Sequence, residues 1–292
     1  MITKYINKGL LLSSAVLFLA SCSPDNLEGE GNGLTQPAVD ASFTVTKTSE
    51  NRYHLKAVND NYVNFINSQW NIDYDGFNNG KNELDIFLPD AGTYVVQRNT
   101  VGIGGQVGGT ASQTIVVPTS DPVAGNIIQG GRFDTPAEVA KWTIHPISPT
   151  KAQWVFSNDG NGNGYATIVA SEGSQQAFYQ AVHVEAGQKY SIDMVASSAT
   201  ALEDAWFEVY MLDSVPAPGS DVSGTVYRNI NTWDGCGKAA FGGKVSSVGC
   251  NSDKNKGIYT ATTTGTVYLF IKCGGKKVSS LSVDKVELRK TT

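Results

Sequence analysis

The chain has 292 residues, of which 17% are charged and 40% hydrophobic, and its formal net charge is -5. The low charge and the 31 glycines suit short strands and turns better than long charged helices, and the acidic balance argues against a nucleic-acid-binding protein. Four cysteines are too few for a scaffold built on disulfides, and the length suggests about two domains with an ordinary core.

Residues 1–21 have the features of an export signal. Lys4 and Lys8 precede an apolar stretch, residues 10–20, that is too short to span a bilayer comfortably. The following Leu19-Ala20-Ser21-Cys22 resembles the lipobox of bacterial lipoproteins, which implies cleavage before Cys22 and lipidation of that cysteine. An ordinary secretory signal is the alternative. Removing the two lysines of the signal, which carries no acids, gives a mature net charge of -7.

Residues 22–37 lack a packing pattern and predict a flexible tether. Its early acidic residues, Asp25, Glu28 and Glu30, resemble the surface-export signals of glycan-degrading Gram-negative bacteria, and a merely solvated linker fits them equally well. With the lipobox, they predict an outer-membrane lipoprotein exposed on the cell surface.

Beyond the tether, a period-two alternation interrupted every 8–12 residues by Gly, Pro, Asn and Asp predicts an all-β chain, with one short helix at residues 135–141. Residues 38–118 predict a small sandwich. Trp70, the turn Asp75-Gly76 and the hairpin Ala91-Gly92-Thr93-Tyr94 resemble a PKD domain, which implies an immunoglobulin-like spacer with Trp70 in its core. Residues 119–125, with Pro122, predict a linker.

Residues 126–292 contain three motifs in a fixed order. They are Asn126 to Gly131-x-Phe133-Asp134 with Trp142, then Val182-x-Val184-x-x-Gly187-x-x-Tyr190, and finally Asp284-x-Val286-x-Leu288. The ordered set resembles the carbohydrate-binding modules of families 4 and 22, which implies a larger β-jelly-roll sandwich that binds polysaccharide. The resemblance makes a β-glucan the leading ligand, of the β-1,3 (laminarin) or mixed-linkage type, and xylan the next.

A sugar ring has an apolar face rimmed by hydroxyls, so a binding cleft needs exposed aromatic rings beside amides and carboxylates. In residues 205–212 one strand face is uniformly apolar, while the other carries Trp206, Glu208 and Tyr210. We expect the two rings to stack on sugars and Glu208 to accept hydroxyl hydrogen bonds. The competing interpretation is aromatic pairing on an exposed sheet face, or a face covered by a loop.

A second stretch with the same character spans residues 225–233. Alternation places Tyr227, Asn229, Asn231 and Trp233 on one face, with two amides between two aromatic rings, and this arrangement also suits hydroxyl recognition. Trp154 shares a strand face with Phe156, and this face fits the core and the cleft equally well.

Cofactor and disulfide expectations concern a few residues. The family resemblance implies a structural Ca²⁺ near Asp134 and Asp284, whose oxygen atoms suit that ion. Cys236 and Cys250 bracket a loop that follows Trp233, so a disulfide between them would fix Trp233 beside the cleft. A Cys250–Cys273 pair is the rival, and the state of Cys273 stays open.

The sequence favours a binder over an enzyme. We find no Glu-x-Asp-x-x-Glu run of jelly-roll glucanases, no metal-binding spacing of the three histidines and no nucleophile elbow. We therefore expect a non-catalytic, lipid-anchored protein that captures polysaccharide for nearby enzymes and an outer-membrane transporter. The alternatives are a structural or adhesive lipoprotein that binds proteins, and a divergent hydrolase. A binder of an acidic glycan is a further alternative, since residues 236–292 hold ten Lys and Arg against three acids.

Overall fold

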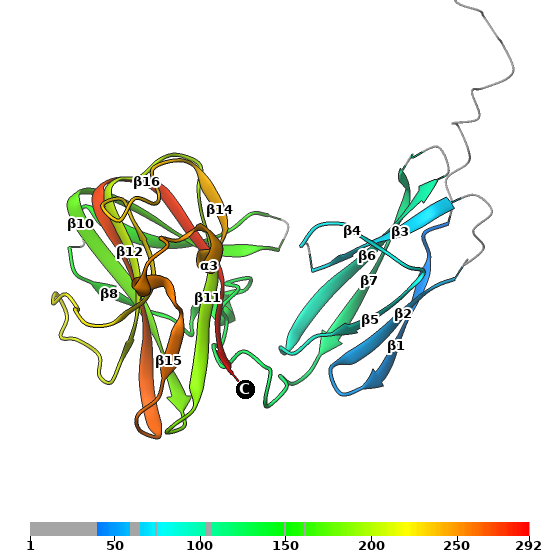
Figure 1. Cartoon of the computed structure of the whole chain (residues 1–292), viewed down its shortest axis with the longest axis horizontal. Helices are drawn as coiled ribbons and strands as arrows, with labels where there is room; N and C mark the ends of the chain where they lie inside the picture. The colour runs from blue at the N-terminus through cyan, green and yellow to red at the C-terminus, as the bar shows by residue number, and fades with distance from the viewer. Residues whose placement is uncertain are drawn as a thin grey trace, which may run out of the picture. The chain divides into compact units, whose positions relative to one another are not determined.

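The structure is a computed structural model that describes residues 40–58, 65–73, 75–102, 105, 107–148, 150–160 and 162–291. The expected signal peptide, residues 1–21, the lipidation site Cys22 and the tether, residues 22–37, lie outside these residues. The described chain is all-β, as predicted, and forms two compact units (Figure 1). The second unit comprises residues 117–292 together with the turn Leu88–Gly92. No helix in the described ranges is long and apolar enough to cross a membrane.

The first unit consists of a three-stranded sheet and a four-stranded sheet, ordered β1-β2-β5 and β4-β3-β6-β7. Trp70 is 3% exposed and contacts Phe43 edge to face at 5.1 Å, so it is a core residue, as predicted. The guanidinium of Arg98 is fully buried next to this ring and donates to Ser68 Oγ. The strands are β1 (Phe43–Ser49), β2 (Arg52–Ala57), β3 (Phe65–Ile72), β4 (Asn78–Gly80), β5 (Glu83–Phe87), β6 (Gly92–Gly102) and β7 (Val107–Val117).

The second unit is built around two long antiparallel strands, β10 (Gly164–Val184) and β16 (Gly265–Lys290). The remaining elements are α2 (Pro136–Val139), β8 (Thr143–Pro146), β9 (Ala152–Asn158), β11 (Lys189–Ser198), β12 (Glu203–Leu212), β13 (Val226–Asn231), β14 (Phe241–Lys244), α3 (Val245–Val248), η1 (Asp253–Asn255) and β15 (Ile258–Thr260). Helix α2 is the short helix expected within residues 135–141, and the Thr135 side chain caps its first turn.

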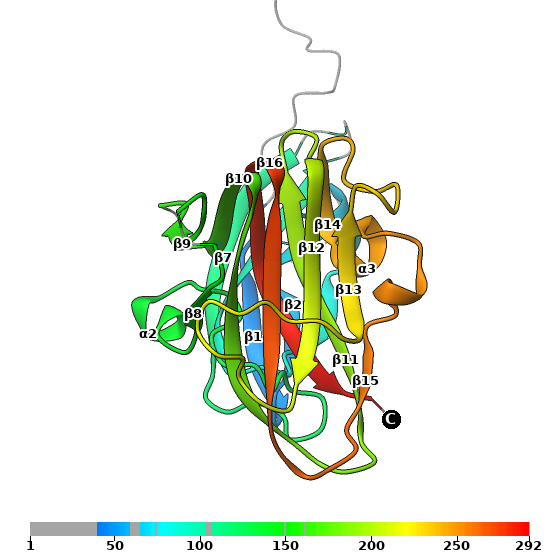
Figure 2. The same ribbon diagram turned by 90° about the vertical axis from the view of Figure 1, so that its left-hand side faces the viewer.

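The strands of this unit form one nine-stranded sheet, and both long strands run through its two layers. β-Bulges between Ile168 and Ser174 bend β10 along its length. The first part of β16 pairs with β12, and its last part pairs with β11. One layer has the order β13-β12-β16-β10-β8 (Figure 2). The other layer contains β9, which pairs with the first part of β10, and β11, which pairs with the last part of β16. The side chains between these layers form one apolar core.

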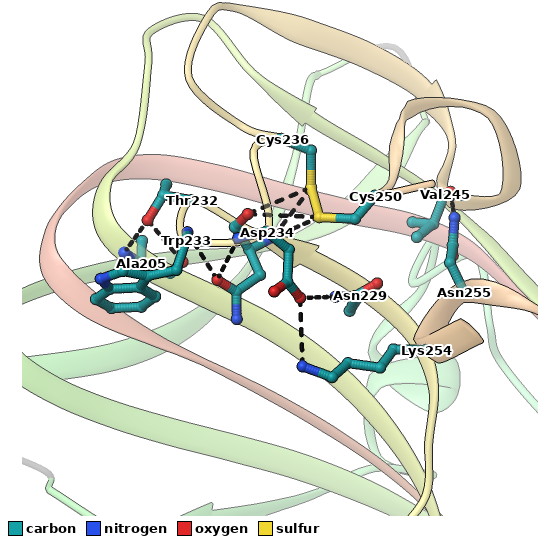
Figure 3. The surroundings of a disulfide bond; sticks show 11 residues. Ala205, Asn229, Thr232, Trp233, Asp234, Cys236, Val245, Cys250, Lys254 and Asn255 are labelled. Atoms are coloured by element: carbon teal, nitrogen blue, oxygen red, sulfur yellow. Dashed lines mark hydrogen bonds and ion pairs between the residues drawn. A yellow bond between two sulfur atoms is a disulfide. The ribbon is translucent and has the colours of Figure 1, made fainter. Parts of the chain in front are cut away.

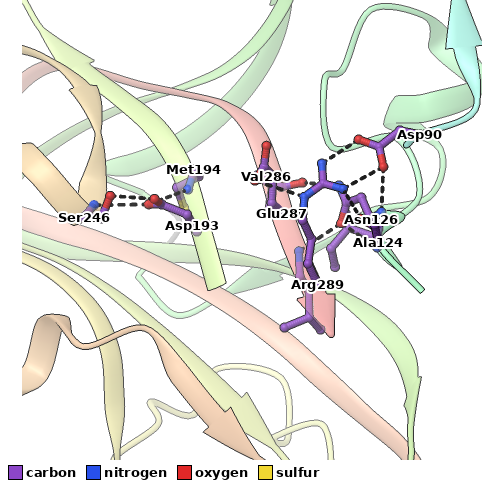
Figure 4. A network of polar contacts seen from close by, with 11 residues as sticks. Asp90, Ala124, Asn126, Asp193, Met194, Ser246, Val286, Glu287 and Arg289 are labelled. Carbon is purple, nitrogen blue, oxygen red and sulfur yellow. Dashed lines mark hydrogen bonds and ion pairs between the residues drawn. The ribbon is translucent and has the colours of Figure 1, made fainter. Parts of the chain in front are cut away.

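The first and last motifs of this unit meet in space (Figure 4). The Asn126 side chain donates to Val286 O and accepts from Leu288 N, which ties the entry segment to the end of β16. Arg289 donates to both carboxylate oxygens of Asp90, at 2.8 and 2.6 Å, and to Ala124 O. These contacts hold the two ends of the unit together, so Asn126 and Arg289 have a structural role.

Candidate functional site

A groove of about 430 Å³ lies on the outward face of the sheet β13-β12-β16-β10-β8. Two indoles, two amides, two carboxylates and one ammonium group meet in it, and they come from strands and loops far apart in the sequence. Its lining residues are Gly173, Gln175, Trp206, Glu208, Asp221, Asn231, Trp233 and Lys272. Four of the eight predicted binding residues, Trp206, Glu208, Asn231 and Trp233, are therefore brought together.

The floor of the groove follows from the strand register. Asn231 pairs with Trp206, Trp206 with Gly274, and Gly274 with Gln175, so these residues form one row across four strands. Gly274 leaves room for the indole, because a Cβ there would lie 2.7 Å from Cζ2 of Trp206. The Trp206 Nε1 group donates to Gln175 Oε1 at 3.0 Å. The ring is thus held in place before any ligand arrives.

Trp233 forms the second aromatic wall. It is 61% exposed, and its ring centroid lies 6.0 Å from that of Trp206, with 30° between the planes. The side-chain oxygen of Asn231 accepts hydrogen bonds from the backbone N–H groups of Trp233 and Asp234, and so fixes the turn that carries the exposed indole. An exposed tryptophan supported in this way offers a large apolar surface at little entropic cost on binding.

The loop behind Trp233 is closed by the Cys236–Cys250 disulfide (Figure 3). This confirms the predicted pair, while Cys273 is a buried free cysteine, so the rival Cys250–Cys273 pair is excluded. Burial raises the pKa of the Cys273 thiol. Asp234 accepts from the Asn229 amide at 3.1 Å and pairs with Lys254 at 3.3 Å, which holds the same loop against β13.

A charged cluster forms the opposite side of the groove. The ammonium group of Lys272, only 5% exposed, lies 3.3 Å from Glu208 Oε2 and 2.9 Å from Asp221 Oδ1. Gln175 donates to the other oxygen of Asp221 at 2.8 Å. Burial alone would raise the pKa of Asp221, but the hydrogen bonds from Lys272 and Gln175 bring it below its ordinary value. Asp221 is therefore ionised at neutral pH.

Two predicted residues lie on the correct face of the sheet but are covered. Tyr210 is 4% exposed, and its hydroxyl donates to Glu208 Oε2 at 2.6 Å. Burial, together with Glu208, raises the pKa of Tyr210. Asn229 is fully buried beneath the loop that carries Asp234. The prediction that Tyr210 and Asn229 contact a ligand is wrong for this conformation, because the irregular segments that follow β12 and β13 fold back over them.

The other two predicted residues point elsewhere. A bulge in the pairing of β12 with β13 breaks the alternation at Tyr227, which packs against the main core and contacts Tyr259 edge to face at 5.7 Å. Trp154 is 4% exposed, contacts Phe178 at 4.8 Å and donates to Gln176 O. Trp154 is a core residue and Tyr227 is a partly buried ring packed against the core, so their assignment to a binding cleft is corrected.

Three groove residues that carry chemistry were missed in the sequence. Gln175 and Lys272 belong to β10 and β16, and only the register of those strands places them beside Trp206 and Glu208. Asp221 lies in the connection between β12 and β13, which has no regular structure. The exposed polar face of β12 was a usable signal, since any residue paired with Glu208 on a neighbouring strand would share that face.

The expected calcium ligands lie near each other, but their surroundings do not suit a cation. Asp134 accepts from Gly164 N and pairs with Arg132 at 2.9 Å, so a guanidinium already neutralises it. Asp284 accepts from the backbone N–H of Lys285. Among the described residues no group of three or more His, Cys, Asp or Glu side chains is placed to hold a metal ion. Ca²⁺ takes six to eight oxygen ligands. These residues do not fit it as they lie, and the calcium expectation stays untested.

Asp284 gives a pH-dependent prediction for the metal-free protein. Burial is the main cause that raises its pKa from 3.8 to about 7. The folded state favours the neutral form of Asp284. The stability that this form contributes is therefore complete below pH 4 and is lost as the pH rises through 7. We expect Asp284→Asn to leave stability at pH 4 unchanged and to raise the free energy of unfolding at pH 8 by about 2–4 kcal/mol. Urea unfolding in EDTA at both pH values measures this, and an equal effect at the two pH values would contradict it.

A second hollow, of about 470 Å³, lies on the outward face of β9, β10 and the last part of β16. Its lining carries hydroxyl groups, an amide, valines and one ring, that of Tyr165, without a charged group. It lacks the paired indoles and the directed acceptors of the groove, so we take the groove as the candidate site.

Comparisons with known proteins return structural neighbours only. No protein-family model matches the sequence, and no curated protein matches it. A structure of carbohydrate-binding modules from the β-sandwich superfamily is similar at 12% identity and a TM-score of 0.32, covering 87% of this chain and 98% of its own. A structure of a family 4 carbohydrate-binding module is similar at 16% identity and a TM-score of 0.36, and the match covers 56% of this chain and 99% of the module.

The enzymatically active domain of tailspike protein 4 from bacteriophage CBA120 is similar at 13% identity and a TM-score of 0.34, covering 60% of this chain and 23% of its own. All three TM-scores are below 0.5 and all three identities are below 25%. The function of the chain is therefore argued from its own residues.

Proposed function

We propose that the second unit binds carbohydrate in the groove without cleaving it. The observation that carries this proposal is the indole pair of Trp206 and Trp233, set beside the amides of Gln175 and Asn231 and the carboxylate of Glu208. Flat apolar rings can stack on sugar C–H faces, while the amides both donate to and accept from hydroxyls. Both described contacts of Glu208 use Oε2, so its Oε1 can accept from a ligand hydroxyl.

The charges in the groove support binding rather than hydrolysis. A glycosidase of the usual kind needs a protonated carboxylic acid with a raised pKa opposite a second carboxylate. Here Glu208 and Asp221 share one lysine, and the pKa of Asp221 is lowered, which makes it a poor general acid at neutral pH.

A neutral polysaccharide fits the site better than an acidic one. The groove has two carboxylates against one ammonium group. Of the ten basic residues in 236–292, only Lys272 lines the groove, and it already pairs with Glu208 and Asp221. The sequence resemblance to modules of families 4 and 22 makes a β-glucan the first candidate, of the laminarin or mixed-linkage type, and xylan the second.

The proposal extends to the cellular setting through the first residues of the chain. A lipid on Cys22 would anchor the protein in the outer membrane, and the tether and first unit would carry the binding unit at the cell surface. Captured polysaccharide would then pass to neighbouring enzymes and to a glycan transporter. The lipobox and the acidic tether support this setting.

Affinity electrophoresis with a panel of neutral and acidic polysaccharides tests the binding function. We expect retardation by at least one neutral β-glucan or xylan, and its loss in Trp233→Ala. The matched control is Phe77→Ala, which removes an aromatic ring, 39% exposed, from the first unit. Equal retardation of wild type and Trp233→Ala, or new reducing ends released steadily from the bound glycan, would overturn the proposal.

A further inference from the structure

The outward face of the binding sheet continues beyond the groove as an aromatic surface. Below the row that holds Trp206 lies a second row in which Glu208 pairs with Lys272, and Lys272 with Ala177. In the third row Tyr210 pairs with Phe270, and Phe270 with Tyr179. The rings of Tyr179 and Phe270 are stacked at 6.2 Å. Left open, these rows would make a broad binding face along the strands.

The connection between β12 and β13, residues 213–225, covers that surface, and we call it the strap. Figure 2 shows it crossing in front of β16 and β10 towards β8. On β8 its Gly219 N–H donates to Pro146 O, and the imidazole of His145 donates to Ser220 O at 2.9 Å. Val222 packs on Tyr210 and Phe270, which are 4% and 0% exposed.

The strap also supplies one wall of the groove. Its Asp221 bonds to Lys272 and Gln175, both of which line the groove, and its side chain remains 47% exposed. A carboxylate has about four acceptor positions, and three donors are seen here: Lys272 Nζ, Gln175 Nε2 and the backbone N–H of Val222. Asp221 can therefore accept one more hydrogen bond, from a group within the groove.

The space that remains open has a direction. It follows the first row across the strands from β13 to β10, three strand spacings or about 14 Å, which is roughly three sugar rings in length. Glu208 and Asp221 lie on the side of this space that faces the second row. The single positive charge of Lys272 balances only one of their two negative charges. An anionic sugar placed there would face an uncompensated carboxylate.

We propose that the strap sets the specificity of the groove: it limits the ligand to a short neutral segment that crosses the strands, and Asp221 acts as a direct hydroxyl acceptor that rejects uronate sugars. This inference rests on the proposed carbohydrate-binding function. It assigns a ligand-selecting role to a segment that contains no predicted binding residue. It also explains why the aromatic rings of the third row do not add to the binding surface.

Isothermal titration calorimetry tests the inference with β-1,3-gluco- and β-1,4-xylo-oligosaccharides of two to six rings, and with the β-1,3-glucan hexamer oxidised to uronate at C6. We expect the affinity to level off at about three rings. The wild type should prefer the neutral hexamer to the uronate form by roughly tenfold or more, and Asp221→Asn should remove most of that preference. The matched control is Asp213→Asn, which removes the same charge from the strap outside the groove lining.

The outcomes separate this inference from the function on which it rests. If a series binds but the affinity rises steadily up to six rings, or if Asp221→Asn and Asp213→Asn keep the same neutral preference as wild type, the strap does not select the ligand, while the binding function stands. If neither series nor any polysaccharide of the panel binds, the proposed function fails and the inference fails with it.

Discussion

Replacing Trp206 by alanine is expected to lower carbohydrate affinity by at least about 30-fold, since truncating a central aromatic anchor costs 2 kcal/mol or more. Trp206 lies in the middle of the groove, its Nε1 group is held by Gln175, and its ring faces Trp233 at 6.0 Å. Alanine removes the stacking surface and also the support of the second indole. Isothermal titration calorimetry with the best-binding glycan of the panel measures the loss.

Two controls make the result specific. Trp206 is on the outward face of the sheet and only partly buried, so the melting temperature of the variant should fall by a few degrees at most. Trp206→Phe keeps an aromatic face but loses the hydrogen bond to Gln175, and it should retain intermediate affinity. If the folded Trp206→Ala protein bound glycan as tightly as wild type, the groove would not be the binding site.

Removing the disulfide is expected to cost about 3 kcal/mol of folding free energy, because the bond between Cys236 and Cys250 closes a loop of about 15 residues. The double variant Cys236→Ala/Cys250→Ala should also bind glycan more weakly. Its loop would still be held by the contacts of Asp234 with Asn229 and Lys254, but it would leave Trp233 less firmly placed. Urea unfolding and calorimetric titration measure the two effects.

A reducing agent provides the control for this prediction. It should lower the unfolding midpoint of wild type to that of the double variant and leave the double variant itself unchanged. Cys273 should not interfere, since it is fully buried and its thiol pKa is raised. A double variant as stable as wild type, or one that responds to reduction as wild type does, would contradict the stabilising role of the bond.

The fold class and the short helix could be predicted from local pattern, and the core position of Trp70 followed from the resemblance to a PKD domain. The Cys236–Cys250 disulfide was one of two pairings that the sequence left open, and the structure decides between them. Alternation within β12 also placed Trp206 and Glu208 correctly, since Phe207 and Val209 fill the core face of that strand. Strand alternation is a reliable guide as long as the strand is regular and one of its faces is buried.

The errors have three physical causes. A bulge reverses the alternation at Tyr227, and single-strand patterns do not reveal bulges. Tyr210 and Asn229 face outward, but the strap covers the first and the turn with Asp234 covers the second, and a connection that folds back over its strand leaves no mark on the strand's own pattern. Trp154 was ambiguous because the apolar face that it shares with Phe156 suits a core and an aromatic cleft equally well, and only the packing against Phe178 decides for the core.

The missed residues show what register adds to pattern. Gln175, Asp221 and Lys272 come from two strands and an irregular connection, and none of them stands in a distinctive local motif. They meet because β10 and β16 pair along nearly their whole length, which aligns Gln175 with Gly274 beside Trp206. The presence of Gln175, Asp221 and Lys272 in the candidate site is therefore a property of the tertiary structure.

The most direct test follows the indole N–H signals of the five tryptophans by nuclear magnetic resonance during titration with a binding oligosaccharide. Trp70, Trp142 and Trp154 are at most 7% exposed, whereas Trp206 and Trp233 line the groove. We predict that the signals of Trp206 and Trp233 shift together along one binding curve while the three core signals stay in place. Unchanged Trp206 and Trp233 signals at saturating ligand would contradict the proposal that this groove binds carbohydrate.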